Sequence, residues 1–152
     1  MRALGIDLGS KRIGIAVSDS AGVLASAVDT VHRSGDRPRE HREILRIGRE
    51  FEVEALVVGV PYTLEGEIGP AAEAILAEIA ELAATTDLPV ETYDERLTTV
   101  SADRLLQDQG LDAKERRKVV DKVAAAILLQ AWLDHRHFAA SDRDQPDSPT
   151  ES

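Results

Sequence analysis

Residues 3–18 read ALGIDLGSKRIGIAVS, two apolar runs separated by a short turn, and this stretch decides the fold. The pattern predicts one strand over residues 2–8, a turn over residues 9–12 and a second strand over residues 13–18. A further short turn leads into a third predicted strand over residues 23–31. Three strands joined by such short turns form an antiparallel meander, because parallel neighbours need a much longer connection.

After residue 31 the apolar pattern alternates between helical and strand periods. It predicts helices over 38–51 and 68–82, strands over 55–60 and 88–93, a helix from Thr98 or Thr99 to Gly110, and a last helix over 116–138. This order predicts an α/β fold with a mixed five-stranded sheet, in which an antiparallel meander is followed by parallel strands, and with helices on both faces. We expect one domain over residues 1–139 and a disordered acidic C-terminal tail over residues 140–152.

The chain has 152 residues, of which 43% are hydrophobic and 30% charged, a composition typical of one globular domain. It contains no cysteine, which excludes a disulfide framework, a thiolate zinc site, an iron–sulfur cluster and a cysteine nucleophile. No apolar run is long enough to cross a bilayer, and Asp7 stands where a signal peptide needs apolar residues. We therefore expect a cytoplasmic protein with no membrane partner.

Charge is distributed unevenly along the chain, whose net charge is −10. Residues 50–95 carry twelve acidic side chains and no basic one. Basic side chains gather between Arg33 and Arg49, and again between Lys114 and Lys122. Such clusters are typical either of a surface that binds phosphates or of a solvated helix face, and the pattern leaves both interpretations open.

Acidic residues at three places in the chain are candidates for a functional site, and each place also has a purely structural explanation. Asp7 lies in an apolar strand, where a carboxylate is costly unless it binds a metal or is paired with turn amides or Lys11. Asp94 and Glu95 follow the last predicted strand, a position where α/β proteins form sites but where acids also cap helices. Asp121 lies at an inward-leaning position of the last predicted helix, or else forms an ion pair on that helix's surface.

Together these positions put carboxylates on the first strand, at a later strand end and on a helix against the same sheet. Hard oxygen ligands of this kind suit Mg²⁺ or Mn²⁺ rather than zinc. Such ions can bind both the attacking and the leaving oxygen of a phosphodiester. The four histidines lie on polar stretches without a triad or zinc motif, and the chain has no P-loop and no GxGxxG motif. The combination favours phosphodiester chemistry.

Four motifs in chain order resemble those of the YqgF family, also called RuvX. They are GIDLGSKRIGIAVSD (5–19), VVGVP (57–61), DERLTT (94–99) and DKVAA (121–125), within a match from residue 2 to about residue 134. Members of this family are RuvC-like proteins of the RNase H fold, assigned as Holliday junction resolvases or as nucleases for the 5′ end of pre-16S rRNA. The resemblance implies a metal-dependent nuclease that processes rRNA in ribosome biogenesis, with a resolvase of branched DNA as the alternative.

The resemblance also assigns roles to residues. It makes Asp7, Glu95 and Asp121 the catalytic metal ligands, with Asp94 as a neighbour of Glu95 or its alternative. We expect basic side chains beside this site or in the basic clusters to contact phosphates: Lys11, Arg12, Arg96, Arg42, Arg46 and Lys118. In the loop after residue 60 the family pattern has Asp-Gly where this chain has Glu65-Gly66, which leaves the substrate specificity of that loop open.

Two other classes of protein compete with a nuclease. An Asp-x-Gly strand followed by a hairpin also occurs in actin, hexokinase and heat-shock ATPases, but those proteins need two such domains and this chain has the length of one. The more serious alternative is a non-catalytic nucleic-acid-binding module, and the presence of all three carboxylates weighs against it. A resolvase must pair with a second copy to cut two strands symmetrically. We expect a monomer or weak homodimer, with Trp132 as one candidate contact.

Overall fold

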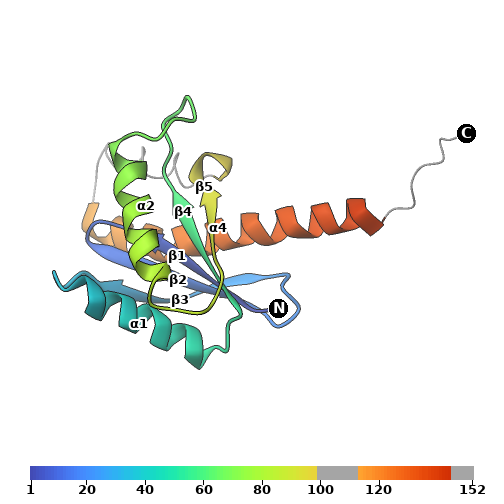
Figure 1. The fold of residues 1–152 in the computed structure, drawn as a ribbon, viewed down its shortest axis with the longest axis horizontal. Coiled ribbons are helices and arrows are strands. Elements are labelled where there is room, and N and C mark those ends of the chain that lie inside the picture. Colours follow the sequence, from blue (N-terminus) through green and yellow to red (C-terminus); the bar gives the residue numbers. More distant parts are fainter. Residues whose placement is uncertain (99–112, 145–152) are drawn as a thin grey trace, which may run out of the picture.

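The structure is a computed structural model that describes residues 1–98 and 113–144; within the last helix it describes side chains over residues 123–139. Its sheet has five strands in the order β3-β2-β1-β4-β5 (Figure 1). The strands are β1 (Ala3–Leu8), β2 (Arg12–Ser18), β3 (Ala25–His32), β4 (Ala55–Val60) and β5 (Val90–Asp94). The first three are antiparallel, while β4 and β5 run parallel to β1, so the predicted mixed sheet is confirmed.

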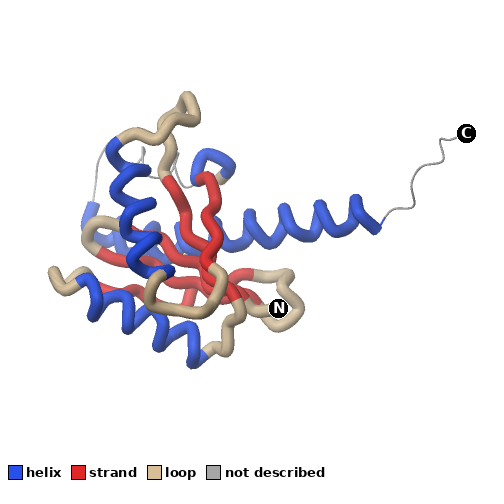
Figure 2. The backbone as a smooth tube through the Cα atoms, in the orientation of Figure 1, coloured by secondary structure: helices blue, strands red, loops and turns tan. Residues whose placement is uncertain are grey.

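Helices cover both faces of this sheet, as the sequence predicts (Figure 2). The helices α1 (Arg37–Glu50) and α2 (Pro70–Ala83) pack on one face, and α4 (Ala113–Asp144) lies on the other. Strand β1 serves both cores because its side chains alternate: Leu4, Ile6 and Leu8 belong to the core under α1 and α2, whereas Ala3 packs with α4. Residues 3, 5 and 7 therefore share the face that α4 covers.

Close packing of α4 against the sheet depends on Gly5. A Cβ atom at this position would lie 2.7 Å from the Cβ of Leu129 and 3.0 Å from the carbonyl oxygen of Ala125. No side chain larger than hydrogen fits there without moving the helix. Further along α4, Trp132 is 6% exposed and packs into the same core. Because it is buried within one copy of the chain, Trp132 does not offer the dimer contact considered from the sequence.

The last helix is longer than predicted. It begins at Ala113 rather than residue 116 and continues to Asp144, past the expected boundary at residue 139 (Figure 1). The first proline after residue 89 is Pro146, so nothing in residues 139–144 forces a helix to stop. The helix expected between Thr98 or Thr99 and Gly110 lies outside the described residues, as do residues 145–152. None of the described helices has a segment long and apolar enough to cross a membrane.

Candidate active site

Asp7 occupies the end of β1 on the face that α4 covers. Its neighbours Ile6 and Leu8 point into the opposite core, so its own carboxylate points toward the α4 side. The side chain is only 2% exposed. A carboxylate buried at a strand end requires compensation by hydrogen bonds, ion pairs or a cation, which makes Asp7 the natural centre of a site.

Glycine stands beside Asp7 on both neighbouring strands. On β2 the residue paired with Asp7 is Gly14. On β4 the parallel register pairs Ile6 with Val58, so the next residue, Gly59, lies beside Asp7. Adjacent strands are about 5 Å apart, and side chains at paired positions normally fill the surface between them. Two glycines leave the surface around the Asp7 carboxylate open to another group.

Glu95 enters the space over Gly59. It begins the short 3₁₀ helix η1 (Glu95–Leu97), directly after β5, and is 4% exposed. A Cβ atom at Gly59 would lie 3.0 Å from Oε1 and 3.1 Å from Cγ of Glu95, so the acid side chain lies across β4. Glu95 Oε1 therefore lies over the β4 position next to Asp7. That these two acids form one site stays a prediction.

Asp94 has a different role from Glu95. It pairs with Val60, whose side chain points to the α1 and α2 face, and its carboxylate accepts a hydrogen bond of 2.9 Å from the backbone N–H of Arg96. The Arg96 side chain also donates to both carboxylate oxygens, at 2.6–3.1 Å. Hydrogen bonding from Arg96 lowers the pKa of Asp94 below its ordinary value. Asp94 therefore serves as the cap and ion-pair partner that its position after a strand also allowed, and Glu95 is the acid whose side chain lies over β4.

Arg96, expected to contact phosphates, holds a loop in this structure. Its guanidinium lies 5.9 Å from the centre of the Tyr62 ring. It also covers Gly66, whose φ of +84° no larger residue adopts easily. The guanidinium thus joins the end of β5 to the loop over residues 61–69.

The third expected ligand, Asp121, belongs to α4, but its side chain lies outside the described residues, as does that of Lys118. Within residues 1–98 and 123–139, no three aspartate, glutamate or histidine side chains come together in a way that could hold a metal ion. The described part of the site therefore consists of two acids, Asp7 and Glu95. Their oxygen donors are of the type that Mg²⁺ and Mn²⁺ prefer.

Among the basic residues expected to bind nucleic acid, the structure brings Lys11 and Arg12 near Asp7. Lys11 is exposed in the turn between β1 and β2, and Arg12 begins β2. Arg42 and Arg46 lie on α1, which packs on the other face of the sheet, so they are not brought together with Asp7 and Glu95. Arg46 is also held by two acids of its own helix, Glu43 at 2.6 Å and Glu50 at 3.1 Å.

A buried charge network behind the β1–β2 turn was not predicted from the sequence. Arg33 donates from Nε to the carbonyl oxygen of Gly9 at 3.0 Å and forms ion pairs with Glu40 and Glu78. The Nε2 atom of His41 lies 2.8 Å from the same Glu78 carboxylate. Burial alone would raise the pKa of Glu40, but hydrogen bonds from Arg33 and Ser34 outweigh it and lower that pKa to about 2. The network fixes the turn that follows Asp7.

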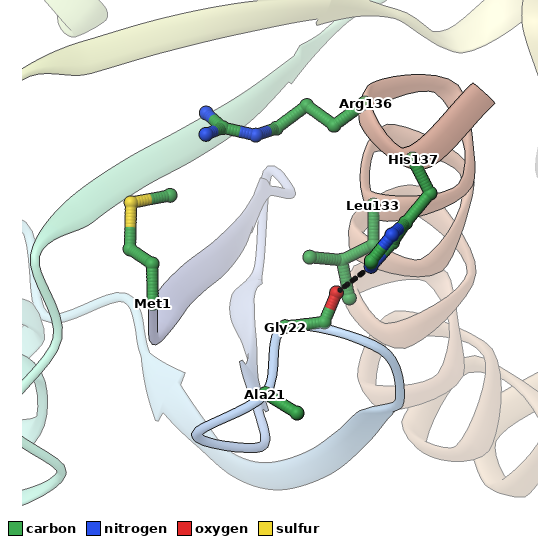
Figure 3. Close-up of a pocket in the computed structure, with 6 residues that line it drawn as sticks. All are labelled: Met1, Ala21, Gly22, Leu133, Arg136 and His137. Carbon is green, nitrogen blue, oxygen red and sulfur yellow. Dashed lines mark hydrogen bonds between the residues drawn. The ribbon is translucent and has the colours of Figure 1, made fainter. Parts of the chain in front are cut away.

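A separate pocket of about 210 Å³ lies at the other end of β1 (Figure 3). It lies between Met1, the turn at Ala21 and Gly22, and the α4 side chains Leu133, Arg136 and His137. His137 approaches the carbonyl oxygen of Gly22 at 2.9 Å, and the Arg136 side chain extends over the opening toward Met1 (Figure 3). Because no carboxylate lines this pocket, it is not part of the candidate active site.

Comparisons with known proteins identify the family of this chain and agree with its fold. A family model described as "RuvX: Holliday junction resolvase" matches residues 1–135. A Nocardia farcinica protein named "Putative pre-16S rRNA nuclease" is 44% identical over an alignment of 157 residues. The alignment covers 99% of this chain and 87% of the relative. A relative with the same name from Clostridium kluyveri is 39% identical over 134 residues, or 88% of this chain and 97% of the relative.

Among solved structures, RuvC of Thermus thermophilus in complex with a Holliday junction substrate superposes with a TM-score of 0.54. The two sequences are 21% identical, and the match covers 91% of this chain and 96% of that one. The strand order, the helices on both faces and this likeness define an α/β protein with a RuvC-like RNase H fold. Within that class, the chain belongs to the RuvX family.

Proposed function

We propose that this protein is a divalent-metal-dependent nuclease that hydrolyses phosphodiester bonds at the 5′ end of pre-16S rRNA. The single observation that carries the chemistry is the pair of buried carboxylates, Asp7 and Glu95, at adjacent positions beside two glycines. The choice of substrate rests on the name "Putative pre-16S rRNA nuclease", which relatives share at 39–46% identity. The protein would meet this RNA in the cytoplasm.

In this proposal Asp7, Glu95 and Asp121 hold Mg²⁺ or Mn²⁺. The direction of α4 supports the third ligand. Leu133 and Arg136 lie beside Met1, before β1 begins, whereas the earlier residue Ala125 contacts Gly5, so the helix runs opposite to β1. One further turn toward the N-terminus of α4 leads to residue 121, just as two further residues of β1 lead to Asp7. The bound ion would polarise the phosphate and activate a water molecule for attack.

The remaining residues of the site would bind the substrate and shape the space around it. Lys11 and Arg12, in and after the turn that follows Asp7, would contact phosphates on either side of the cleaved bond. Gly14 would leave room for the scissile phosphate next to the Asp7 carboxylate, whereas the space over Gly59 is taken by Glu95. Arg42 and Arg46 could reach only RNA that extends to the α1 face, which a long precursor can do and a short oligonucleotide cannot.

A resolvase is the second candidate function, favoured by the description of the family model and by the likeness to RuvC. The decisive experiment is a cleavage assay in which the purified protein is incubated with a pre-16S leader RNA or with a four-way DNA junction, each with Mn²⁺ or Mg²⁺. We expect cleavage of the RNA at the 5′ end of the 16S sequence and none of the junction. Symmetric cuts in the junction alone would instead identify a resolvase. Binding of either substrate without cleavage would identify a non-catalytic module.

A further inference from the structure

We propose that Gly59 is a positioning residue for the metal site, because its lack of a side chain allows the Glu95 carboxylate to lie over β4, on the side toward Asp7. This inference rests on the proposed function and adds to it a residue that touches neither metal nor substrate. Gly59 stands in an otherwise branched and apolar strand, between Val58 and Val60. Glycine weakens such a strand, so its presence suggests a close approach by another group.

The approaching group is defined by three contacts. A Cβ atom on Gly59 would lie 3.0 Å from Oε1 and 3.1 Å from Cγ of Glu95, and 3.2 Å from Cδ2 of Leu128 on α4. Each of these distances is shorter than an ordinary van der Waals contact, so even a methyl group would force a neighbour to move. Leu128 is 2% exposed and belongs to the closely packed helix α4, whereas the nearest atom, Oε1, is the far end of the flexible Glu95 side chain. Glu95 is therefore the group that gives way.

The direction of that movement matters for the site. Gly59 lies between Tyr93 on β5 and the position of Asp7 on β1. Glu95 begins at the β5 side and must pass over Gly59 to bring its carboxylate toward β1. A methyl group on Gly59 would push the carboxylate outward, away from the sheet and from Asp7. Supporting residues that orient a metal ligand typically change metal affinity by about 10–100-fold when altered.

The test compares Mn²⁺ binding, by electron paramagnetic resonance or calorimetry, in the full chain and in Gly59→Ala. We expect the variant to fold with a similar melting temperature and to bind Mn²⁺ at least about tenfold more weakly. Gly48→Ala is the matched control. It adds the same methyl group to a buried glycine, 3.2 Å from Cγ2 of Val53, but in α1 on the other face of the sheet. It should leave Mn²⁺ affinity unchanged.

A compensating substitution shows whether the added methyl group acts through Glu95 or through Leu128. Glu95→Asp shortens the acid by one methylene, so the added methyl group should cost less affinity in the Glu95→Asp background than in the parent. If Gly59→Ala weakens binding equally in both backgrounds, the methyl group acts through Leu128 and α4, and the inference is wrong. Parent-like Mn²⁺ affinity in Gly59→Ala would also overturn it.

The same measurements distinguish a failure of the proposed role of Gly59 from a failure of the proposed nuclease function. If the parent binds Mn²⁺ and loses it as predicted in Gly59→Ala, but cuts no RNA, then Gly59 positions the site and the assignment as an RNA nuclease fails. If the parent binds no Mn²⁺ at all, both the metal site and the role of Gly59 are refuted.

Discussion

The guanidinium of Arg33 forms a two-point ion pair with the carboxylate of Glu78, in which Nη1 donates to Oε2 at 2.7 Å and Nη2 donates to Oε1 at 2.8 Å. Glu78 is 3% exposed and Arg33 17%, so the pair is largely shielded from water. The same guanidinium binds Glu40 on α1 and the carbonyl oxygen of Gly9. One side chain thus connects both helices of this face to the turn that follows Asp7.

Removal of the Arg33 charge should destabilise the fold severely. Arg33→Met removes the guanidinium that the buried Glu40 and Glu78 share and leaves Glu78 with only His41 and the more distant Arg37. Breaking a buried ion pair in this way typically costs about 3–5 kcal/mol. Urea unfolding of the variant and the parent measures this difference. Arg46→Met is the control, because Arg46 pairs with Glu43 on an exposed helix surface and should cost less than about 1 kcal/mol. Equal losses in the two variants would show that burial of the Arg33 network is not important for stability.

The same network predicts a loss of stability in acid. Glu40 has an ordinary pKa of 4.5 and a pKa of about 2 in the folded protein, and the pKa of Glu78 is lowered in the same direction. A lowered carboxyl pKa stabilises the folded state fully above the unfolded pKa, and this contribution disappears as the pH falls toward the folded pKa. The free energy of unfolding should therefore fall as the pH is lowered from about 4.5 toward 2.

Glu40→Gln provides the check on this acid dependence, since glutamine cannot titrate. Urea unfolding between about pH 5.5 and pH 2.5 should give a shallower decline for this variant than for the parent. A decline of the same steepness in both proteins would show that other carboxylates control the acid transition.

Asp121 is tested by melting with and without Mg²⁺. Crowded carboxylates repel one another in the absence of metal, so Asp121→Asn should melt at or above the parent temperature without Mg²⁺. Mg²⁺ at ten times its Kd should stabilise the parent by about 1.4 kcal/mol, and the variant should lose most of this increment. If Asp121 is instead a surface partner of Arg117 or Lys118, the variant should lose a few tenths of a kcal/mol and respond to Mg²⁺ like the parent.

Salt dependence tests which basic residues contact phosphates. Replacing Lys11 and Arg12 by glutamine should weaken RNA binding and reduce the slope of log K against log salt by about 0.7 for each lost contact to a single strand. The paired change of Arg42 and Arg46 to glutamine should leave the binding of a short RNA unaltered, because α1 lies on the other face of the sheet. Unchanged slopes in the Lys11 and Arg12 variant would exclude that turn as a phosphate contact.

The strand pattern around Asp7 was sufficient to predict the sheet, because turns of a few residues allow only antiparallel neighbours and the later αβ alternation allows only parallel ones. Asp7 and Glu95 could be selected as candidate site residues because each is an acid in or directly after a buried strand, and their role in catalysis stays a prediction. The sequence did not decide whether Asp94 or Glu95 is the candidate ligand. The distinction depends on the 3₁₀ turn that directs Glu95 to the α4 face, a feature that strand periodicity does not encode.

Other parts of the site depend on contacts between residues far apart in the chain. Arg33 looked like one arginine in a basic cluster, and only its packing against Glu78, 45 residues later, reveals a buried network. Arg96 likewise binds Asp94 and the loop over residues 61–69. Gly59 did leave a signal in the sequence, since a glycine within an apolar strand indicates a close approach. The side chain that approaches it could not be named without the register of β4 and β5.

The most direct test of the account is a single-turnover measurement of pre-16S leader cleavage by Asp7→Asn in the presence of Mn²⁺. Asparagine keeps the shape of Asp7 but removes its charge, so the variant should fold and melt like the parent or slightly higher. The rate constant should fall by at least about a hundredfold, equivalent to about 2.7 kcal/mol in the activation barrier. A folded Asp7→Asn protein that cuts the same RNA at the parent rate would contradict the assignment of Asp7 as the centre of the active site.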